Sequence, residues 1–96
     1  DIKFPQVPTD ADYVEIEGLA FEYVSQMREI AGEEDCHVMV QGEFSLSCAV
    51  VQILNNPAND NFVPVCATSE RRVEEMPDGS VRRWFEFVQF RRYCNL

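Results

Sequence analysis

A continuous helical pattern from Thr9 to Gly32 constrains this chain more than any other feature of its sequence. Apolar residues recur there at steps of three and four, the spacing of one face of an amphipathic helix. Thr9 followed by Asp12 predicts the N-terminal cap, and Gly32 predicts a left-handed stop. Such a helix spans roughly 33 Å, so it must cross most of a sheet to bury its apolar face. That face comprises Tyr13, Ile16, Leu19, Ala20, Tyr23, Val24, Met27, Ile30 and Ala31.

Length and composition predict one domain over residues 1–96, because a chain that is 46% hydrophobic can build a single core. No apolar run approaches the length of a bilayer-spanning helix, which argues against membrane insertion. Residues 1–48 carry the whole net charge of −9, and this acidic half argues against nucleic acid as a partner. The chain begins at Asp1 without an initiator methionine or a signal-like segment, which suggests a processed mature form.

Four cysteines in a small chain are typical of two disulfides in a secreted domain, so we expect an extracellular protein. Alternating apolar residues on both sides of Gly42 predict a hairpin centred there. Cys36 and Cys48 each lie six residues from that centre, so the hairpin would place them opposite each other, within reach of a disulfide. Cys66 and Cys94 would then form the second bridge.

Two further segments separate or precede these elements. The first seven residues contain Ile2 and Phe4 with a proline, and they fit either a short edge strand or a loose arm. Residues 55–61 are dense in turn-forming side chains and predict a surface loop between two hairpins.

The dipeptide Asp78-Gly79 is the strongest hairpin signal in the chain, and extended runs over residues 62–76 and 81–93 flank it. With these two residues as the loop, opposite charges face each other across the strands. Each such pair contributes a few tenths to ~1 kcal/mol. The pairs predicted by this register are Glu75 with Arg82, Glu74 with Arg83, and Arg71 with Glu86, beside Val73 with Trp84.

The same register sorts the side chains of this hairpin onto two faces. It places Cys66 and Cys94 on different faces, so their bridge requires a bulge or a register change toward the open end. The expected core face carries Val63, Val65, Ala67, Val73, Trp84, Val88 and Phe90. The expected outer face carries Glu70, Arg72, Glu74, Arg83, Phe85 and Phe87.

Arg72, Arg83, Phe85 and Phe87 on the outer face form a candidate binding site. Aromatic residues and arginine together are enriched at protein interfaces. The alternative is that the hairpin twists, a bulge exchanges the two faces, and Phe85 and Phe87 belong to the core.

The order of expected elements, a possible strand, one long helix and two hairpins, resembles the cystatin family. The stretch Val14-Glu15-Ile16-Glu17-Gly18 is similar to the start of the helix in secreted cystatins, and so is the late pair Cys66 and Cys94. This resemblance implies a twisted antiparallel sheet around one helix. It also implies that the loops at Gln41-Gly42 and Asp78-Gly79 are binding elements, as in the wedge that inhibits papain-like proteases. The arm before the helix has no glycine, however, and neither loop keeps the inhibitory motif of the family.

No catalytic or metal-binding pattern stands out. His37 is the single histidine, and its neighbour Cys36 is expected to lie in a disulfide rather than to act as a nucleophile. No Cys-x-x-Cys spacing exists that would suggest zinc. We therefore expect no enzyme, cofactor or metal site.

The sequence thus predicts an α+β fold, with one long N-terminal helix on a twisted antiparallel sheet of four or five strands and two disulfides. The predicted function is a secreted module that binds another protein through its hairpin loops, as a protease inhibitor or as a venom- or defence-type effector (toxin). The alternative is a structural or carrier domain that self-associates as a homodimer through Phe85 and Phe87.

Overall fold

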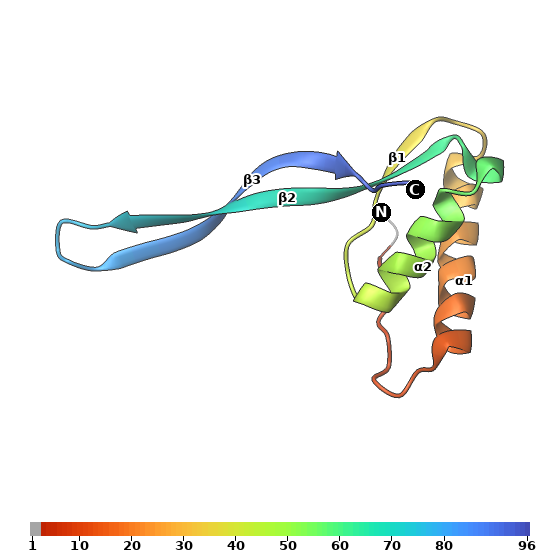
Figure 1. Cartoon of the computed structure of the whole chain (residues 1–96), viewed down its shortest axis with the longest axis horizontal. Helices are drawn as coiled ribbons and strands as arrows, with labels where there is room; N and C mark the ends of the chain where they lie inside the picture. Colours follow the sequence, from red (N-terminus) through yellow and green to blue (C-terminus); the bar gives the residue numbers. More distant parts are fainter. Residues whose placement is uncertain (1–2) are drawn as a thin grey trace.

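The computed structural model describes residues 3–96 (Figure 1). Within this range the chain forms one sheet of three strands in the order β1-β2-β3, in which β1 is parallel to β2 and β2 is antiparallel to β3. The fold is α+β, but the predicted architecture of one helix on four or five antiparallel strands is wrong. The elements are α1 (Tyr13–Ala31), β1 (Cys36–Met39), α2 (Phe44–Leu54), the short 3-10 helix η1 (Pro57–Asn59), β2 (Phe62–Glu75) and β3 (Val81–Arg92).

The molecule consists of a body and a projecting arm. Helices α1 and α2 lie side by side on the base of the sheet, and the hairpin of β2 and β3 extends away from them (Figure 1). The overall extents are 55 × 34 × 28 Å. The radius of gyration is 17.1 Å, whereas a compact domain of this length has about 12 to 13 Å. Much of the hairpin is therefore outside the core.

Helix α1 is the expected long helix with a later start. It begins at Tyr13 rather than Thr9, because Asp12 is the N-cap and its carboxylate accepts a hydrogen bond of 3.0 Å from the N–H of Glu15. The helix stops at the predicted Gly32, whose φ is positive at 58°, but its ψ of −123° is not that of the predicted left-handed helical stop. The buried face consists of Ile16, Ala20, Tyr23, Val24 and Met27, whereas Tyr13 and Ile30 are exposed.

Helix α2 replaces the second strand of the hairpin predicted around Gly42. The residues Leu46, Val50 and Leu54 recur at four-residue steps, and all three are buried against the core that α1 provides. The carboxylate of Glu43 accepts hydrogen bonds of 3.0 and 2.9 Å from two N–H groups in the first turn, which begins the helix. The alternating pattern also fitted a strand, but the helix buries one apolar stripe and caps its own end.

All four cysteines are free, so both predicted disulfides are wrong. Because residues 44–54 are helical, no hairpin brings Cys48 to Cys36; Cys48 is exposed on α2 and Cys36 begins β1. Cys66 pairs with Arg91 across the β2–β3 ladder, and Cys94 lies beyond the end of β3.

The N-terminal segment forms no strand within residues 3–12, so of the two alternatives the structure shows an arm. The Phe4 ring lies edge-on to the Tyr23 ring, with 5.3 Å between centroids. It also covers Gly42, where an added Cβ would lie 2.5 Å from Cδ1 of Phe4. Asp1 and Ile2, which belong to the same predicted segment, lie outside the described residues. The predicted loop at residues 55–61 is present and contains η1.

Candidate binding site

The projecting hairpin has support from the body only at its base. Strand β1 pairs with β2 over Phe62–Val65, and within the described chain the remainder of β2 pairs with β3 alone. An isolated two-stranded hairpin is at best marginally stable in water. Beyond Val65, the ribbon is therefore held within the described chain by its own ladder alone.

The turn at the tip has a three-residue loop, one residue longer than predicted. The N–H of Met76 donates to the carbonyl of Ser80 at 2.8 Å, and the N–H of Gly79 donates to the carbonyl of Met76 at 3.0 Å. Pro77 thus occupies the second position of a β-turn, which suits its fixed φ, and Gly79 follows with a φ of 88°. The carboxylate of Asp78 accepts hydrogen bonds from the hydroxyl and the N–H of Ser80, which hold the pKa of Asp78 below its ordinary value.

The longer loop shifts the register by one residue, so the predicted cross-strand pairs are wrong. A slip of one residue also moves every side chain of one strand to the opposite face relative to its partner strand. The observed pairs are Glu75 with Val81, Glu74 with Arg82, Val73 with Arg83, Arg72 with Trp84, Arg71 with Phe85, and Glu70 with Glu86.

Phe85 and Phe87 consequently share a face with Val73. The register shift required by the predicted Cys66–Cys94 bridge is present further along the hairpin, and it brings Phe90 onto the same face. The rings of Phe87 and Phe90 pack at 5.2 Å between centroids. We name these four residues the apolar face; their exposed fractions are 58% (Val73), 75% (Phe85), 57% (Phe87) and 59% (Phe90). Phe85 and Phe87 are thus surface residues, not core.

Arg72 lies on the opposite, charged face, so the predicted patch is divided. Its guanidinium contacts the carboxylates of Glu86 at 2.8 Å and Glu70 at 2.7 Å. The hydrogen bond that Arg72 donates to Glu86, followed by the charge of Glu70, raises the pKa of Arg72. Trp84, which was expected in the core, also lies on this face, with the guanidinium of Arg82 4.9 Å from its ring centroid. Three of the exposed charges of this face, those of Arg72, Glu70 and Glu86, are thus paired within the hairpin.

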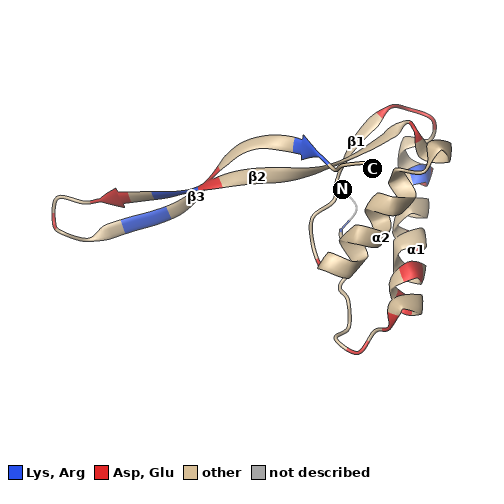
Figure 2. Cartoon of the chain, in the orientation of Figure 1, with Lys and Arg blue, Asp and Glu red and all other residues tan. Residues whose placement is uncertain are grey.

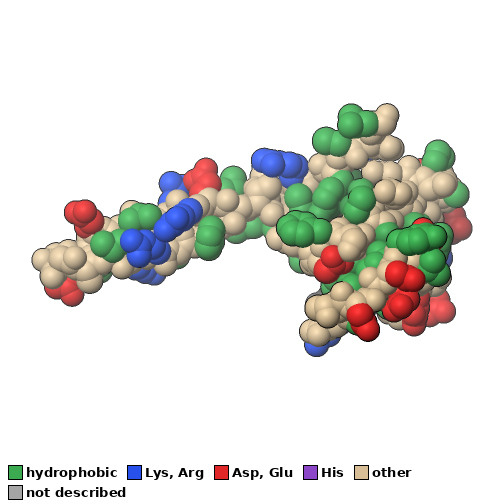
Figure 3. Space-filling model, turned by 60° about the horizontal axis from the view of Figure 1, so that its bottom comes forward, with side chains coloured by type: hydrophobic (Ala, Val, Ile, Leu, Met, Phe, Trp, Pro, Cys, Tyr) green, Lys and Arg blue, Asp and Glu red, His purple; other side chains and the backbone are tan. Residues whose placement is uncertain are grey.

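Basic side chains border the apolar face. The register places Arg71, Arg83 and Arg92 on this side of the ribbon, with Glu75 as the acidic residue among them. Figure 3 shows hydrophobic and basic side chains interspersed along the arm. The body differs, because residues 1–65 hold twelve acidic and two basic residues (Figure 2). The body is therefore strongly acidic, whereas the arm, with six basic and five acidic residues over 66–96, is nearly balanced in charge.

The other two predicted loop residues lie far from the tip. The side-chain oxygen of Gln41 accepts a hydrogen bond of 3.4 Å from the N–H of Ala67, at the base of the hairpin. Gly42 lies beneath Phe4 in the body. The turn with Asp78 and Gly79 lies at the opposite end of the molecule (Figure 1), so the two loops do not form one wedge.

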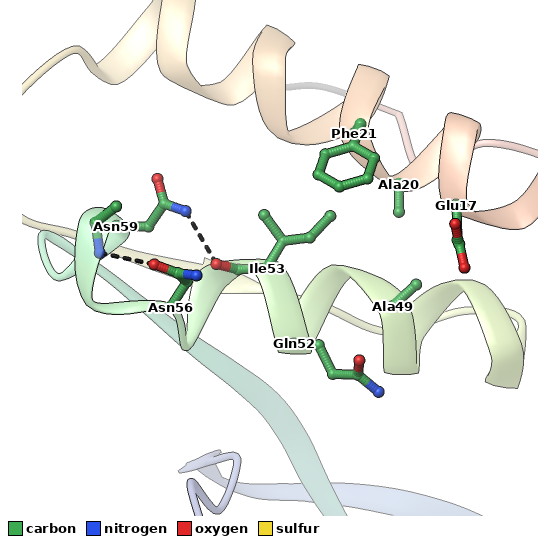
Figure 4. Close-up of a pocket in the computed structure, with 9 residues that line it drawn as sticks. Glu17, Ala20, Phe21, Ala49, Gln52, Ile53, Asn56 and Asn59 are labelled. Carbon is green, nitrogen blue, oxygen red and sulfur yellow. Dashed lines mark hydrogen bonds between the residues drawn. The ribbon is translucent and has the colours of Figure 1, made fainter.

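A hollow between α1 and α2 is a concave surface of the body (Figure 4). Two of the amide side chains that line it hold the local backbone. The side chain of Asn59 donates to the carbonyl of Ile53 at 2.9 Å, and that of Asn56 accepts from the N–H of Ala58 at 3.0 Å. Glu17 is the titratable residue of its lining. The hollow offers no paired acid and base for catalysis.

Two classes of feature are absent from residues 3–96. No three His, Cys, Asp or Glu side chains lie together as a metal-ligand cluster. None of the helices described combines the length and apolar character needed to cross a bilayer.

Two members of the apolar face, Val73 and Phe90, were predicted from the sequence to lie in the core. Pro77 was the available signal, since a proline suits the second position of a β-turn and so implies the longer loop and its register. The local shift that turns Phe90 outward has no comparable mark in the sequence.

The family model described as the Uncharacterized protein MJ1673 family matches residues 1–91. The chain belongs to the MJ1673 family. Searches among curated proteins and among solved structures returned no match. The matched range of this MJ1673-family chain includes both helices and all but the last residue of β3, so the hairpin is part of the family domain.

Proposed function

We propose that this MJ1673-family protein is a protein-binding module whose contact surface is the apolar face of the hairpin. The observation that supports the proposal is the exposure of Phe85, Phe87 and Phe90 along one side of a projecting ribbon. Contiguous exposed aromatic side chains mark interaction sites on soluble proteins. Full burial of one such side chain contributes about 1.5 to 3 kcal/mol, so three of them form a sufficient anchor.

The chemistry of the face indicates the kind of partner. Three arginines border it, and within its own hairpin Arg71 faces Phe85 while Arg83 faces Val73, so neither lies opposite an acidic residue. A partner that presents apolar side chains surrounded by carboxylates would complement both features. Such a contact combines burial of the rings with charge pairs at the rim.

An inhibitory wedge would need two adjacent hairpin loops, whereas Gln41 lies at the base of the arm and Asp78 lies in the turn between β2 and β3 at its tip. Secretion was expected from two disulfides. All four cysteines are free, so this support for secretion is lost.

Photocrosslinking in cells tests the proposal. Phe87 is replaced with the photoreactive analogue p-benzoylphenylalanine, and Gln89, which lies on the other face of the same strand, is replaced in the matched control. We expect a discrete protein to crosslink from position 87 and not from position 89. Equal crosslinking from both positions, or none from position 87, would refute the assignment of this face.

A second pair of variants tests the chemistry of the partner. Arg82 and Arg83 are neighbours in the chain but lie on opposite faces. Arg83→Gln should reduce the crosslink from position 87, whereas Arg82→Gln should leave it unchanged. An equal effect of the two substitutions would show that the basic rim does not contribute.

A further inference from the structure

Strand β2 has a free edge that begins where β1 ends. The last ladder pair between them is Met39 with Val65. Beyond it, the side-chain oxygen of Gln41 accepts a hydrogen bond from the N–H of Ala67. From Ser69 to Glu75, no other strand of the described chain lies on this side of β2. Such an edge presents unpaired N–H and C=O groups that can accept another strand.

The hydrogen bonds at the base show which residues point outward at this edge. The carbonyl of Val65 accepts from the N–H of Val40 on the β1 side, whereas the carbonyl of Pro64 accepts from the N–H of Tyr93 on the β3 side. The N–H of Ala67 also points to the β1 side, toward Gln41. Because these directions alternate along a strand, the outward groups beyond Ala67 belong to Ser69, Arg71, Val73 and Glu75.

The charges along this edge are antisymmetric about Val73. The sequence reads Arg71-Arg72-Val73-Glu74-Glu75, with two bases before the valine and two acids after it. An antiparallel copy of the same strand, centred on the same valine, would place each base opposite an acid. This arrangement is self-complementary, as a two-fold interface requires.

We infer that the protein forms a homodimer in which the β2 edges of two copies pair antiparallel across a two-fold axis at Val73. Arg71 lies opposite Glu75 of the second copy, and Arg72 lies opposite its Glu74. The outward groups of Val73, Arg71 and Glu75 then close about six backbone hydrogen bonds between the copies. The result is one four-stranded sheet made from two hairpins.

The charges select this register over its neighbours. Moving the axis to Arg72 places that arginine opposite itself and Glu70 opposite Glu74, and moving it to Glu74 places that glutamate opposite itself. Like charges in directly opposed positions destabilise a sheet. The outer edge of β3 is a weaker candidate for such pairing between copies. Its best register, centred on Trp84, offers one kind of opposite-charge pair, Arg82 of one copy with Glu86 of the other.

The shape of the molecule permits the pairing. Because the copies run antiparallel and the axis lies near the tip, the two bodies lie at opposite ends of the joined sheet (Figure 1). In this register the Gly79 turn of one copy reaches Ala67 of the other. There the side chain of Gln41 accepts the hydrogen bond of the Ala67 N–H, and the free edge begins just beyond it. The paired segment therefore fills the edge that β1 leaves open. The axis is perpendicular to the sheet, so both apolar faces lie on the same side.

The dimer is an inference separate from the proposed function, because it uses the edge of the ribbon and leaves the apolar face open. Its test is the mass of the full chain in solution, by light scattering and sedimentation over a dilution series. We expect the wild-type protein to be a dimer that dissociates on dilution, more readily at high salt. A wild-type monomer at every concentration would overturn the inference.

Charge exchange at two residues tests the register. Arg71 and Glu75 suit this purpose, because within their own hairpin they face the uncharged Phe85 and Val81. Arg71→Glu and Glu75→Arg should each weaken the dimer by roughly tenfold to a hundredfold, since each places like charges opposite each other twice. A mixture of the two variants should form a heterodimer, and the double variant Arg71→Glu/Glu75→Arg should recover the homodimer.

Arg83→Glu is the matched control, a charge reversal on β3 away from the edge, and it should leave the dimer intact. Circular dichroism of each variant establishes that the fold is retained. A dimer that persists in both single variants, or singles that fail to recover in the mixture and in the double variant, would overturn the inferred edge. Loss of the dimer in Phe85→Ser/Phe87→Ser but not in the charge variants would place self-association on the apolar face instead.

Discussion

The hydroxyl of Tyr93 donates a hydrogen bond of 2.6 Å to the backbone carbonyl oxygen of Val40. This bond joins the chain just after β3 to the chain just after β1, and Val40 is fully buried. The N–H of Tyr93 also donates to the carbonyl of Pro64 in β2 at 3.0 Å. One residue thus fastens the base of the projecting hairpin to the body from both sides.

Removing this hydroxyl should destabilise the protein. In Tyr93→Phe the ring remains but the buried carbonyl of Val40 loses its partner, which costs about 1 to 3 kcal/mol. Urea denaturation should show that loss in the free energy of unfolding. Tyr13→Phe is the control, because Tyr13 is exposed and its hydroxyl makes no such bond within the described residues, so its midpoint should not change.

Stability should also fall at alkaline pH. Burial raises the pKa of Tyr23, and burial together with the neighbouring Cys66 raises the pKa of Tyr93. A raised pKa means that the folded state holds the phenolic proton more tightly than the unfolded chain, in which tyrosine titrates near pH ~10. The resulting stabilisation is complete below that pH and is lost as the pH rises through the folded-state values.

The free energy of unfolding should therefore decrease from about pH 10 upward. It should decrease less steeply in Tyr23→Phe/Tyr93→Phe, which lacks both phenolic protons. Urea titrations at a series of pH values measure this slope. An unchanged slope in the double variant would contradict the assignment of the two tyrosines.

Arg28 binds the loop before β2 to the end of α1. Its guanidinium donates to the carbonyl of Gly32 at 2.9 Å, to the side-chain oxygen of Asn61 at 3.0 Å and to that of Asn59, and it lies 4.4 Å from the ring centroid of Phe62. A lysine keeps the charge but cannot reproduce the planar fork that serves these acceptors.

Arg28→Lys should therefore lower the free energy of unfolding by about 1 to 3 kcal/mol. The control Arg83→Lys changes an exposed arginine of the hairpin and should be neutral within about 0.5 kcal/mol. Thermal and urea unfolding monitored by circular dichroism measure both. Equal stability of the two variants would show that the loop does not depend on Arg28.

The elements that the sequence predicted well are those with one dominant physical signal. Helix α1 combines a single 3.6-residue stripe with a glycine, Gly32, that permits a positive φ where the helix stops. The tip of the second hairpin was located correctly by Asp78-Gly79, because that dipeptide favours a reversal of the chain. The apolar runs on both sides of it became β2 and β3.

The errors arose where one pattern served two structures. Phe44, Leu46, Cys48 and Val50 alternate as in a strand, but Leu46, Val50 and Leu54 also follow a helical step, and only packing against α1 distinguishes the two. The two expected disulfides depended on that strand and on an even cysteine count. Neither argument contains the geometry that brings two thiols together.

The charges of β2 were read as pairs within one hairpin, although Arg71 and Glu75 face uncharged residues in the observed register. The loop of three residues, set by Pro77, decides this, and a shift of one residue reverses which side chains share a face. The apolar face was for this reason only half identified. Arg83, Phe85 and Phe87 were grouped correctly, whereas Val73 and Phe90 were assigned to the core.

The cap of α2 gives a prediction at acidic pH. The carboxylate of Glu43 accepts hydrogen bonds from the hydroxyl and N–H of Ser45 and from the N–H of Leu46, and these bonds hold the pKa of Glu43 below its ordinary value. A depressed pKa means that the ionised form is favoured in the folded state. Its contribution is present above the ordinary value of about 4.3 and is lost as the pH falls through the folded-state pKa.

Glu43→Gln should therefore lower the midpoint of thermal unfolding at pH 7, because the neutral amide accepts these hydrogen bonds less strongly. The difference from the wild-type protein should disappear once the pH is below the folded-state pKa, where Glu43 is itself protonated. The control Glu29→Gln removes an exposed charge from α1 and should show no such convergence. A constant difference between Glu43→Gln and the wild type across the acidic range would show that the carboxylate charge does not stabilise the start of α2.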